Sequence, residues 1–101
     1  MKNVNCVSVI SDTHGVIDPY IISYLKNSDV IIHAGDICST KIISDLEKYC
    51  EHVFLVAGNN DIPEKYSTSE DKNIIKELNK SLTININNKN ISIEHGDRFG
   101  H

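Results

Sequence analysis

The sequence repeats one pattern three times: a short apolar segment that ends at a polar side chain. The three segments span residues 5–11, 29–34 and 52–57. The first alternates apolar with polar residues and the other two are mostly apolar, and both patterns are typical of β-strands. The polar side chains that follow them, Asp12, Asp36 and Asn59, are 24 and 23 residues apart, about the length of one compact strand–helix unit. The pattern therefore predicts neighbouring strands whose ends lie side by side.

Short helices are predicted between these strands. Pro19 favours the first turn of a helix over residues 19–27, with Asp18 as its N-cap. Ser39 or Thr40 is suited to cap a second helix that runs to about Tyr49. Strands that alternate with helices indicate right-handed βαβ units, and hence an α/β fold with a parallel sheet.

The last third of the sequence has a different pattern. Residues 58–73 form a long polar connection, and residues 70–79 predict a further helix. Residues 82–86 and 91–94 alternate cleanly around an asparagine-rich stretch at 87–90, which indicates a β-hairpin. No linker or repeat divides the chain, so residues 1–101 are expected to form a single domain.

Composition narrows the functional classes. The net charge of −4 disfavours binding to a nucleic-acid backbone, and the apolar runs are too short to span a membrane. The N-terminal residues lack the pattern of a signal peptide. The three cysteines are odd in number and show no CxxC spacing, so we expect small core residues in a cytoplasmic protein.

The predicted strand ends gather side chains that bind metals. Asp12 and His14 follow the first strand, Asp36 the second, Asn59 the third, and His95 the last strand of the hairpin. Ligands of open α/β sheets bind outside the carboxyl ends of the strands. Carboxylate, amide and imidazole ligands suit Mn²⁺ first, with Fe²⁺, Zn²⁺ or Ni²⁺ as alternatives. We expect two divalent metal ions, with Asp36 at the middle strand as the bridging carboxylate.

Each of these motifs also has an ordinary structural explanation. Asp36 could simply begin a helix, Asn59 and Asn60 could form a turn, and His95 could end a strand at a glycine. Their joint occurrence in order at strand ends is the stronger signal.

The ordered motifs resemble those of a known family. Asp12-x-His14, Gly35-Asp36, Gly58-Asn59-x-Asp61 and His95-Gly96 resemble the calcineurin-like metallophosphoesterases, and the third motif is similar to that of the small bacterial and archaeal phosphodiesterases. The resemblance implies a β-sandwich flanked by helices. It also implies hydrolysis of a small phosphodiester or phosphomonoester substrate by a water that two metal ions activate.

The resemblance further implies a role for each matched residue. Asp12 and His14 would bind the first metal, Asp36 would bridge, and Asn59 and His95 would bind the second metal. The expected catalytic group consists of Asp36, Asn59, Asn60 and Asp61. In it, Asp61 would orient its loop. Many relatives have a histidine at the position of Asn60 that contacts substrate and protonates the leaving group, and this sequence departs from that pattern.

A second departure concerns the end of the sequence. The family's closing Gly-His-x-His motif, expected one helix and one strand after His95, has no counterpart before His101. We therefore expect a fold that is incomplete at its C-terminus, with a second copy of the chain covering the open sheet. Two alternatives to an active enzyme follow: an inactive fragment, or a non-catalytic protein-binding scaffold like the retromer subunit that resembles this family.

Overall fold

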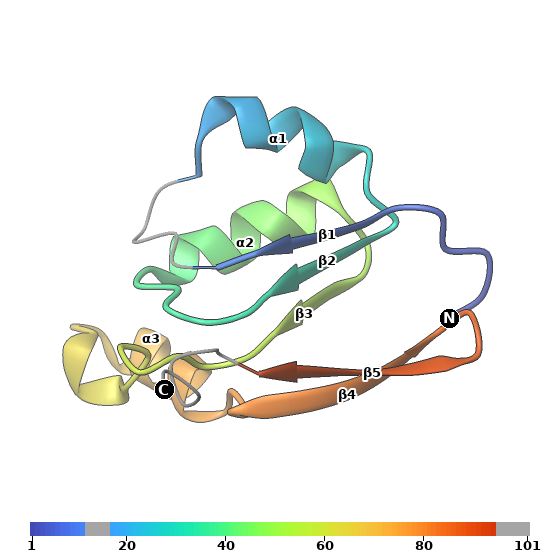
Figure 1. Ribbon diagram of the computed structural model, residues 1–101. Coiled ribbons are helices and arrows are strands. Elements are labelled where there is room, and N and C mark those ends of the chain that lie inside the picture. The colour runs from blue at the N-terminus through green and yellow to red at the C-terminus, as the bar shows by residue number, and fades with distance from the viewer. Residues whose placement is uncertain (12–16, 95–101) are drawn as a thin grey trace.

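The computed structural model describes residues 1–11 and 17–94. Helices and strands alternate along the first half of the chain, and a hairpin ends it (Figure 1). In chain order the elements are β1 (Val7–Ile10), α1 (Pro19–Lys26), β2 (Val30–His33), α2 (Thr40–Tyr49), β3 (Val53–Leu55), the 3₁₀ helix η1 (Pro63–Lys65), α3 (Ser69–Lys76), β4 (Ser81–Ile86) and β5 (Lys89–Glu94).

Local sequence signals set the helix starts. The carboxylate of Asp18 accepts the N–H of Tyr20 at 2.8 Å, and Pro19 occupies the first turn of α1, as predicted. At α2 the N-cap is Ser39, whose hydroxyl accepts the N–H of Lys41. Thr40, the alternative cap, instead donates its hydroxyl to Asp71 at 2.6 Å. It thereby joins α2 to α3.

The first three strands form the predicted parallel sheet. Their order is β1-β2-β3, so β2 is the middle strand, and all four of its residues are buried. Because parallel strands share one direction, their carboxyl ends lie at one edge of the sheet. Because β2 and β3 are neighbours in this order, their carboxyl ends lie side by side, as predicted.

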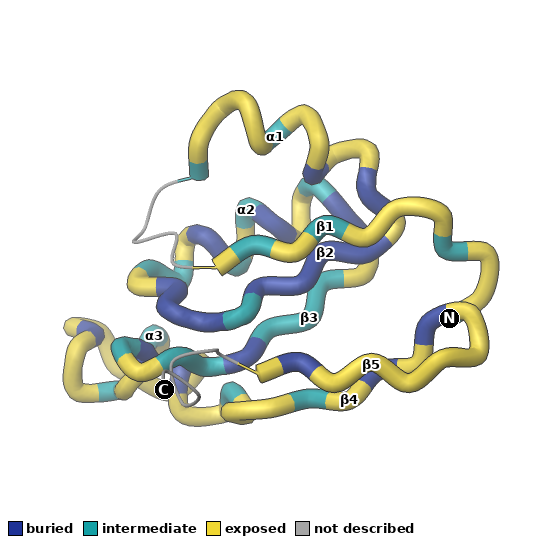
Figure 2. Tube along the Cα trace, viewed as in Figure 1, coloured by how far each residue is buried: buried dark blue, intermediate teal, exposed yellow. Residues whose placement is uncertain are grey.

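Side chains on the two faces of this sheet pack into two separate cores. Between them, β2 is buried along its whole length (Figure 2). Toward α1 and α2, Ile31 packs with Leu25 and Leu46. Toward the hairpin, Val30 and Ile32 pack with buried isoleucines of β4 and β5. The structure is therefore a helical layer, a parallel sheet and a second sheet, which is the predicted β-sandwich flanked by helices.

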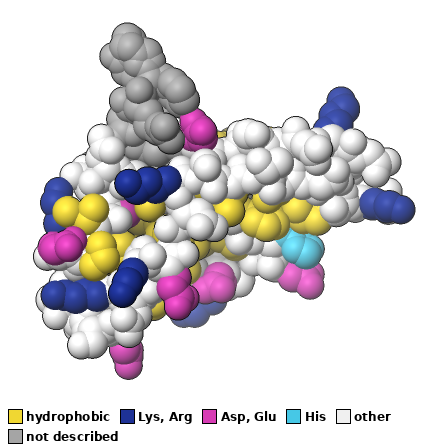
Figure 3. Space-filling view, turned by 90° about the horizontal axis from the view of Figure 1, so that it is seen from below, with side chains coloured by type: hydrophobic (Ala, Val, Ile, Leu, Met, Phe, Trp, Pro, Cys, Tyr) yellow, Lys and Arg dark blue, Asp and Glu magenta, His cyan; other side chains and the backbone are white. Residues whose placement is uncertain are grey.

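The hairpin covers the sheet unevenly. Val9 on β1 pairs in register with Ile32 on β2, yet Val9 is 65% exposed while Ile32 is 3% exposed. Seen from below, hydrophobic side chains form a band beside a broad surface of other side chains and backbone (Figure 3). The sandwich core thus lies over β2 and β3 more than over β1.

The turn of the hairpin is tighter than predicted. Asn87 and Asn88 form it alone, with φ angles of 51° and 67°. Lys89 and Asn90 pair with β4 and belong to the strand. Asparagine tolerates this left-handed conformation, which a two-residue hairpin turn requires.

Other boundaries also differ from the predictions. The helix predicted over residues 70–79 is α3, which ends at Lys76 with Glu77 as its C-cap. The long polar connection contains η1. Of the cysteines expected in the core only Cys50 is buried, because Cys6 precedes an edge strand and Cys38 lies in a loop. No helix in the described part of the chain has the length and apolar character that a membrane crossing demands.

Candidate functional site

The loops that follow β2 and β3 meet at the carboxyl edge of the parallel sheet. The loop after β2 has an unusual backbone, because Gly35, Asp36 and Cys38 have φ angles of 116°, 57° and 65°. Side chains other than those of glycine and a few polar residues rarely adopt this region. Such conformations persist only where the surroundings impose them, and they concentrate at functional sites.

Gly58 lets the second loop approach the first. A Cβ atom at this position would lie within 2.5 Å of the Asp36 Oδ1 atom and closer still to the Asp36 backbone nitrogen. At Gly58 the requirement is close packing against Asp36 rather than a turn.

The carboxylate of Asp36 is held at this junction. The residue is 7% exposed, and its Oδ1 accepts the backbone N–H of Asn60 at 3.0 Å. This hydrogen bond fixes the carboxylate of the β2 loop against the β3 loop. Asp36 therefore occupies the position expected for a bridging ligand, at the end of the middle strand.

Asp61 joins the same two loops from below the surface. Its Oδ1 accepts the N–H groups of Ile37 and Cys38 at 2.8 and 3.3 Å and the hydroxyl of Tyr66 at 3.2 Å. Its Oδ2 accepts the N–H of Gly58 at 2.8 Å. Asp61 is only 5% exposed, and these four hydrogen bonds satisfy its buried carboxylate. The contacts are those that a loop-orienting residue needs.

This arrangement changes the pKa of the Tyr66 hydroxyl. Burial raises the pKa of its hydroxyl far above the usual value, and the negative charge of Asp61 raises the pKa further. Tyr66 is consequently a neutral hydrogen-bond donor to Asp61. No motif predicted this contact, since Tyr66 lies in the polar connection.

His33, the last residue of the buried strand β2, lies beneath the loop. It is fully buried, and its Nδ1 accepts the N–H of Gly35 at 3.1 Å. Because Nδ1 accepts, the ring proton belongs on Nε2. The ring thus supports the left-handed turn that precedes Asp36.

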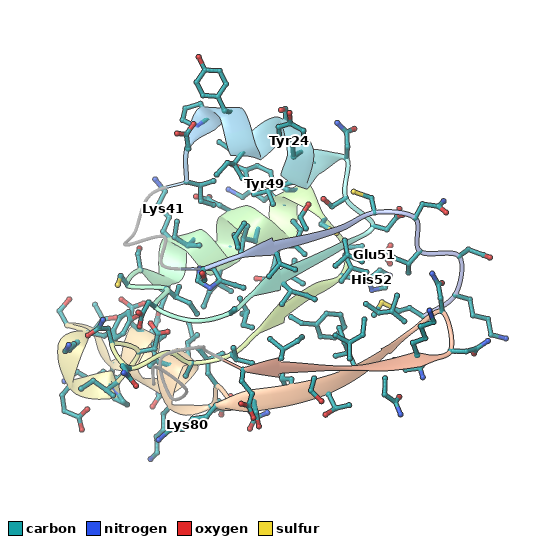
Figure 4. All side chains as sticks on the ribbon, in the orientation of Figure 1. Tyr24, Lys41, Tyr49, Glu51, His52 and Lys80 are labelled. Atoms are coloured by element: carbon teal, nitrogen blue, oxygen red, sulfur yellow. The ribbon has the colours of Figure 1, made fainter. Side chains whose placement is uncertain are left out.

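His52, by contrast, is distant from these loops. It is exposed and immediately precedes β3, so it lies at the opposite edge of the sheet, next to Glu51 (Figure 4).

The predicted ligands are only partly placed. Asp36 and the exposed Asn59 are brought to the same junction, whereas Asp12, His14 and His95 lie outside the described residues. Within residues 1–11 and 17–94, no group of three or more His, Cys, Asp or Glu converges as a metal site. A carboxylate and an amide oxygen are donors that fit a divalent cation such as Mn²⁺. The roles of all five ligands remain predictions.

Comparison with known proteins agrees with this architecture. Residues 6–101 match the calcineurin-like phosphoesterase superfamily domain. This match covers nearly the whole chain, and the chain therefore belongs to the calcineurin-like phosphoesterase family.

Two curated relatives have the same family character. A probable metallophosphoesterase of Mycoplasma pneumoniae is 46% identical over 57 residues, covering 55% of this chain and 33% of the relative. A probable metallophosphoesterase of Mycoplasma genitalium is 48% identical over 56 residues, covering 54% of this chain and 32% of the relative. The matched segment thus spans about a third of each relative's length.

Solved structures show the same fold. Vps29 from Entamoeba histolytica, as a single-residue variant, matches with a TM-score of 0.68 and 21% identity over 91% of this chain and 48% of that chain. Vacuolar Protein Sorting 29 from Cryptosporidium parvum matches with a TM-score of 0.68 and 19% identity over 94% of this chain and 51% of that one. The mixed α/β fold of this chain is therefore that of a calcineurin-like metallophosphoesterase.

Proposed function

We propose that this protein hydrolyses a small phosphodiester or phosphomonoester, with a water molecule activated at a centre of two divalent metal ions. The observation that supports this best is the buried carboxylate of Asp36, fixed by the Asn60 N–H at the carboxyl edge of the sheet. Family membership supports the same reaction class. The residues proposed to hold the ions are Asp12, His14, Asp36, Asn59 and His95.

Two metal ions, when bound, would offset the negative charge of the phosphoryl group and lower the pKa of the attacking water. The chain's own residues would prepare the site for them. Asp36 would present its carboxylate between the two ions, with Asn60 restricting its rotation. Asp61 would keep both loops in place, because its four hydrogen bonds span them. Such fixed ligands cost little reorganisation during the reaction.

Hydrolysis of bis(p-nitrophenyl) phosphate by purified, Mn²⁺-loaded protein tests the proposal. We expect release of p-nitrophenol that depends on Mn²⁺ and is lost in Asp36→Ala. Thermal unfolding of both proteins checks that the variant is folded. If the wild type shows no hydrolysis above the Asp36→Ala background, this chain is not a phosphoesterase.

A non-catalytic scaffold is the second candidate function. Two observations favour it. The fold matches Vacuolar Protein Sorting 29, and Asn60 occupies the position where many relatives have a histidine that protonates the leaving group. Titration of the protein with Mn²⁺ in a calorimeter separates the two functions. Binding at two sites with micromolar affinity would argue against a pure scaffold, and absence of binding would argue against the enzyme.

A further inference from the structure

A cavity opens beside the junction of the two loops. Its volume is about 290 Å³, and its lining residues are Cys38, Asn60, Lys65 and Tyr66. They come from the loops after β2 and β3 and from the end of η1. The volume is near the lower limit of pockets that hold small ligands, roughly 300 Å³. The cavity therefore has room for a small group rather than for a large substrate.

Lys65 gives this cavity a positive charge. Its Nζ donates a hydrogen bond to the Asn60 Oδ1 atom at 2.7 Å. An amide oxygen is neutral, so this contact orients the ammonium group without neutralising it. An ammonium group has three N–H donors, and this contact uses one. The Lys65 ammonium group is thus held in one orientation by Asn60 and can still bind an anion.

Among the described residues, no acidic side chain lines this cavity. Asp61 already accepts four hydrogen bonds from Ile37, Cys38, Gly58 and Tyr66. The Tyr66 hydroxyl donates to Asp61, and it remains protonated because its pKa is raised. The wall of the cavity therefore combines one cation with neutral polar groups, in a protein whose net charge is −4.

Asn60 connects the cavity to the candidate metal site. Its side-chain oxygen accepts from Lys65, while its backbone N–H donates to the Asp36 carboxylate. One residue thus contacts both the proposed bridging ligand and the cation of the cavity. The cavity is therefore one residue away from the proposed bridging ligand.

We propose that this cavity binds a second anionic group of the substrate and that Lys65 selects for it. The inference rests on the proposed phosphoesterase function and specifies its substrate class. The preferred substrates would be phosphate esters that have a further phosphate or carboxylate beyond the phosphate that reacts, as in a nucleoside 3′,5′-bisphosphate. Charge-assisted hydrogen bonds to an ammonium group are the strong class of such contacts.

Alkylation of Cys38 measures anion binding without any enzymatic activity. Cys38 is an exposed cysteine in the cavity wall, and the exposed Cys6 lies elsewhere and serves as an internal control. Metal-free protein is treated with iodoacetamide in a titration with inorganic pyrophosphate, and labelling of each cysteine is followed by mass spectrometry. We expect pyrophosphate to slow labelling of Cys38 but not of Cys6.

Variants of Lys65 then assign the effect to this side chain. Lys65→Gln should abolish the protection of Cys38, and Lys65→Arg should retain it. Lys72→Gln, which removes an exposed lysine of α3, is the matched control and should behave as wild type. Equal protection of Cys38 and Cys6, or undiminished protection in Lys65→Gln, would overturn the proposal.

Steady-state kinetics test the substrate class. In Lys65→Gln we expect kcat/KM for a nucleoside 3′,5′-bisphosphate to fall about tenfold, the loss expected for one charge-assisted hydrogen bond, while kcat/KM for bis(p-nitrophenyl) phosphate hardly changes. Equal losses for the two substrates would show that Lys65 is not a specificity residue. If the wild type hydrolyses neither substrate, the phosphoesterase function fails, and the labelling experiment still decides whether the cavity binds anions.

Discussion

One aspartate fixes each end of the parallel sheet, and the two aspartates differ in their surroundings. At the amino ends of the strands, Asp29 is exposed, and its Oδ2 accepts the N–H groups of Asn5 and Cys6 at 2.8 and 3.1 Å. At the carboxyl ends, Asp61 is 5% exposed and accepts four hydrogen bonds. Water replaces a lost hydrogen bond at the surface but not in the interior. The same kind of contact therefore stabilises the carboxyl end far more.

The backbone shows the same difference. The connections before β2 and β3, at residues 27–29 and 50–52, contain no positive φ angle. The loop after β2 contains three, at Gly35, Asp36 and Cys38. Strained conformations cost about 1–3 kcal/mol each and require surroundings that impose them. The comparison indicates that stability is used at the carboxyl edge to hold Asp36 in one conformation.

Of the substitutions that test this comparison, Asp61→Ala should lower the stability of the protein most. We expect the free energy of unfolding to fall by about 3–5 kcal/mol, because buried donors lose their acceptor. Urea denaturation followed by circular dichroism measures it. Asp61→Asn, which keeps the shape but replaces an acceptor with a donor, should lie between wild type and Asp61→Ala. A loss no greater than that of Asp29→Ala would contradict the difference between the two ends.

Gly58→Ala should disturb the approach of the two loops. The added methyl group would overlap the Asp36 backbone nitrogen and Oδ1, so one loop must shift. We expect a loss of about 1–3 kcal/mol, as for an overpacked interior. Chemical shifts of the Asp36 and Asn60 amides measure the displacement, and hydrolysis of bis(p-nitrophenyl) phosphate should decline with it. Unchanged amide shifts would show that the loops tolerate a Cβ atom there.

Ionisation of Tyr66 should lower the stability of the carboxyl end at alkaline pH. Its pKa is raised in the folded protein, so folding favours the neutral hydroxyl. This contribution is fully present below the unfolded value of about 10 and is lost as the pH rises above it. The melting temperature of the wild type should therefore decline more steeply above that pH than that of Tyr66→Phe. Parallel curves would exclude the contribution.

Asp29→Ala should have the smallest effect. The loss of two exposed hydrogen bonds is expected to lower the free energy of unfolding by about 1 kcal/mol. Hydrolysis of bis(p-nitrophenyl) phosphate should not change, since Asp29 is at the opposite edge from the proposed site. Reduced hydrolysis at unchanged stability would show that the two ends are coupled.

The sequence predicted the order of strands and helices because their signals are local. Apolar periodicity predicted β2, the Asp18 and Pro19 pair predicted the start of α1, and the position of Asp36 followed from the strand order. Ends that depend on tertiary contacts were predicted less well. The helix expected to reach residue 79 ends at Lys76, and Cys38, expected in the core, is exposed.

No sequence motif predicted the part of the site that contains Lys65 and Tyr66. Lys65 and Tyr66 lie in a polar connection without periodicity, and only the turn of η1 brings them to Asn60 and Asp61. Their contacts depend on the path of the chain after β3. A pattern of residue types does not specify that path.

The sequence by itself determined the family, the order of the elements and the strand ends that hold Asp36 and Asn59, because these depend on local periodicity and on residue types at fixed spacing. Only the tertiary structure decided how the carboxyl edge is held together. The close approach of Gly58 to Asp36 and the hydrogen bonds that Asp61 accepts from Ile37 and Cys38 join residues that are 22 to 24 positions apart. Such contacts form through packing between loops, which sequence spacing alone does not encode.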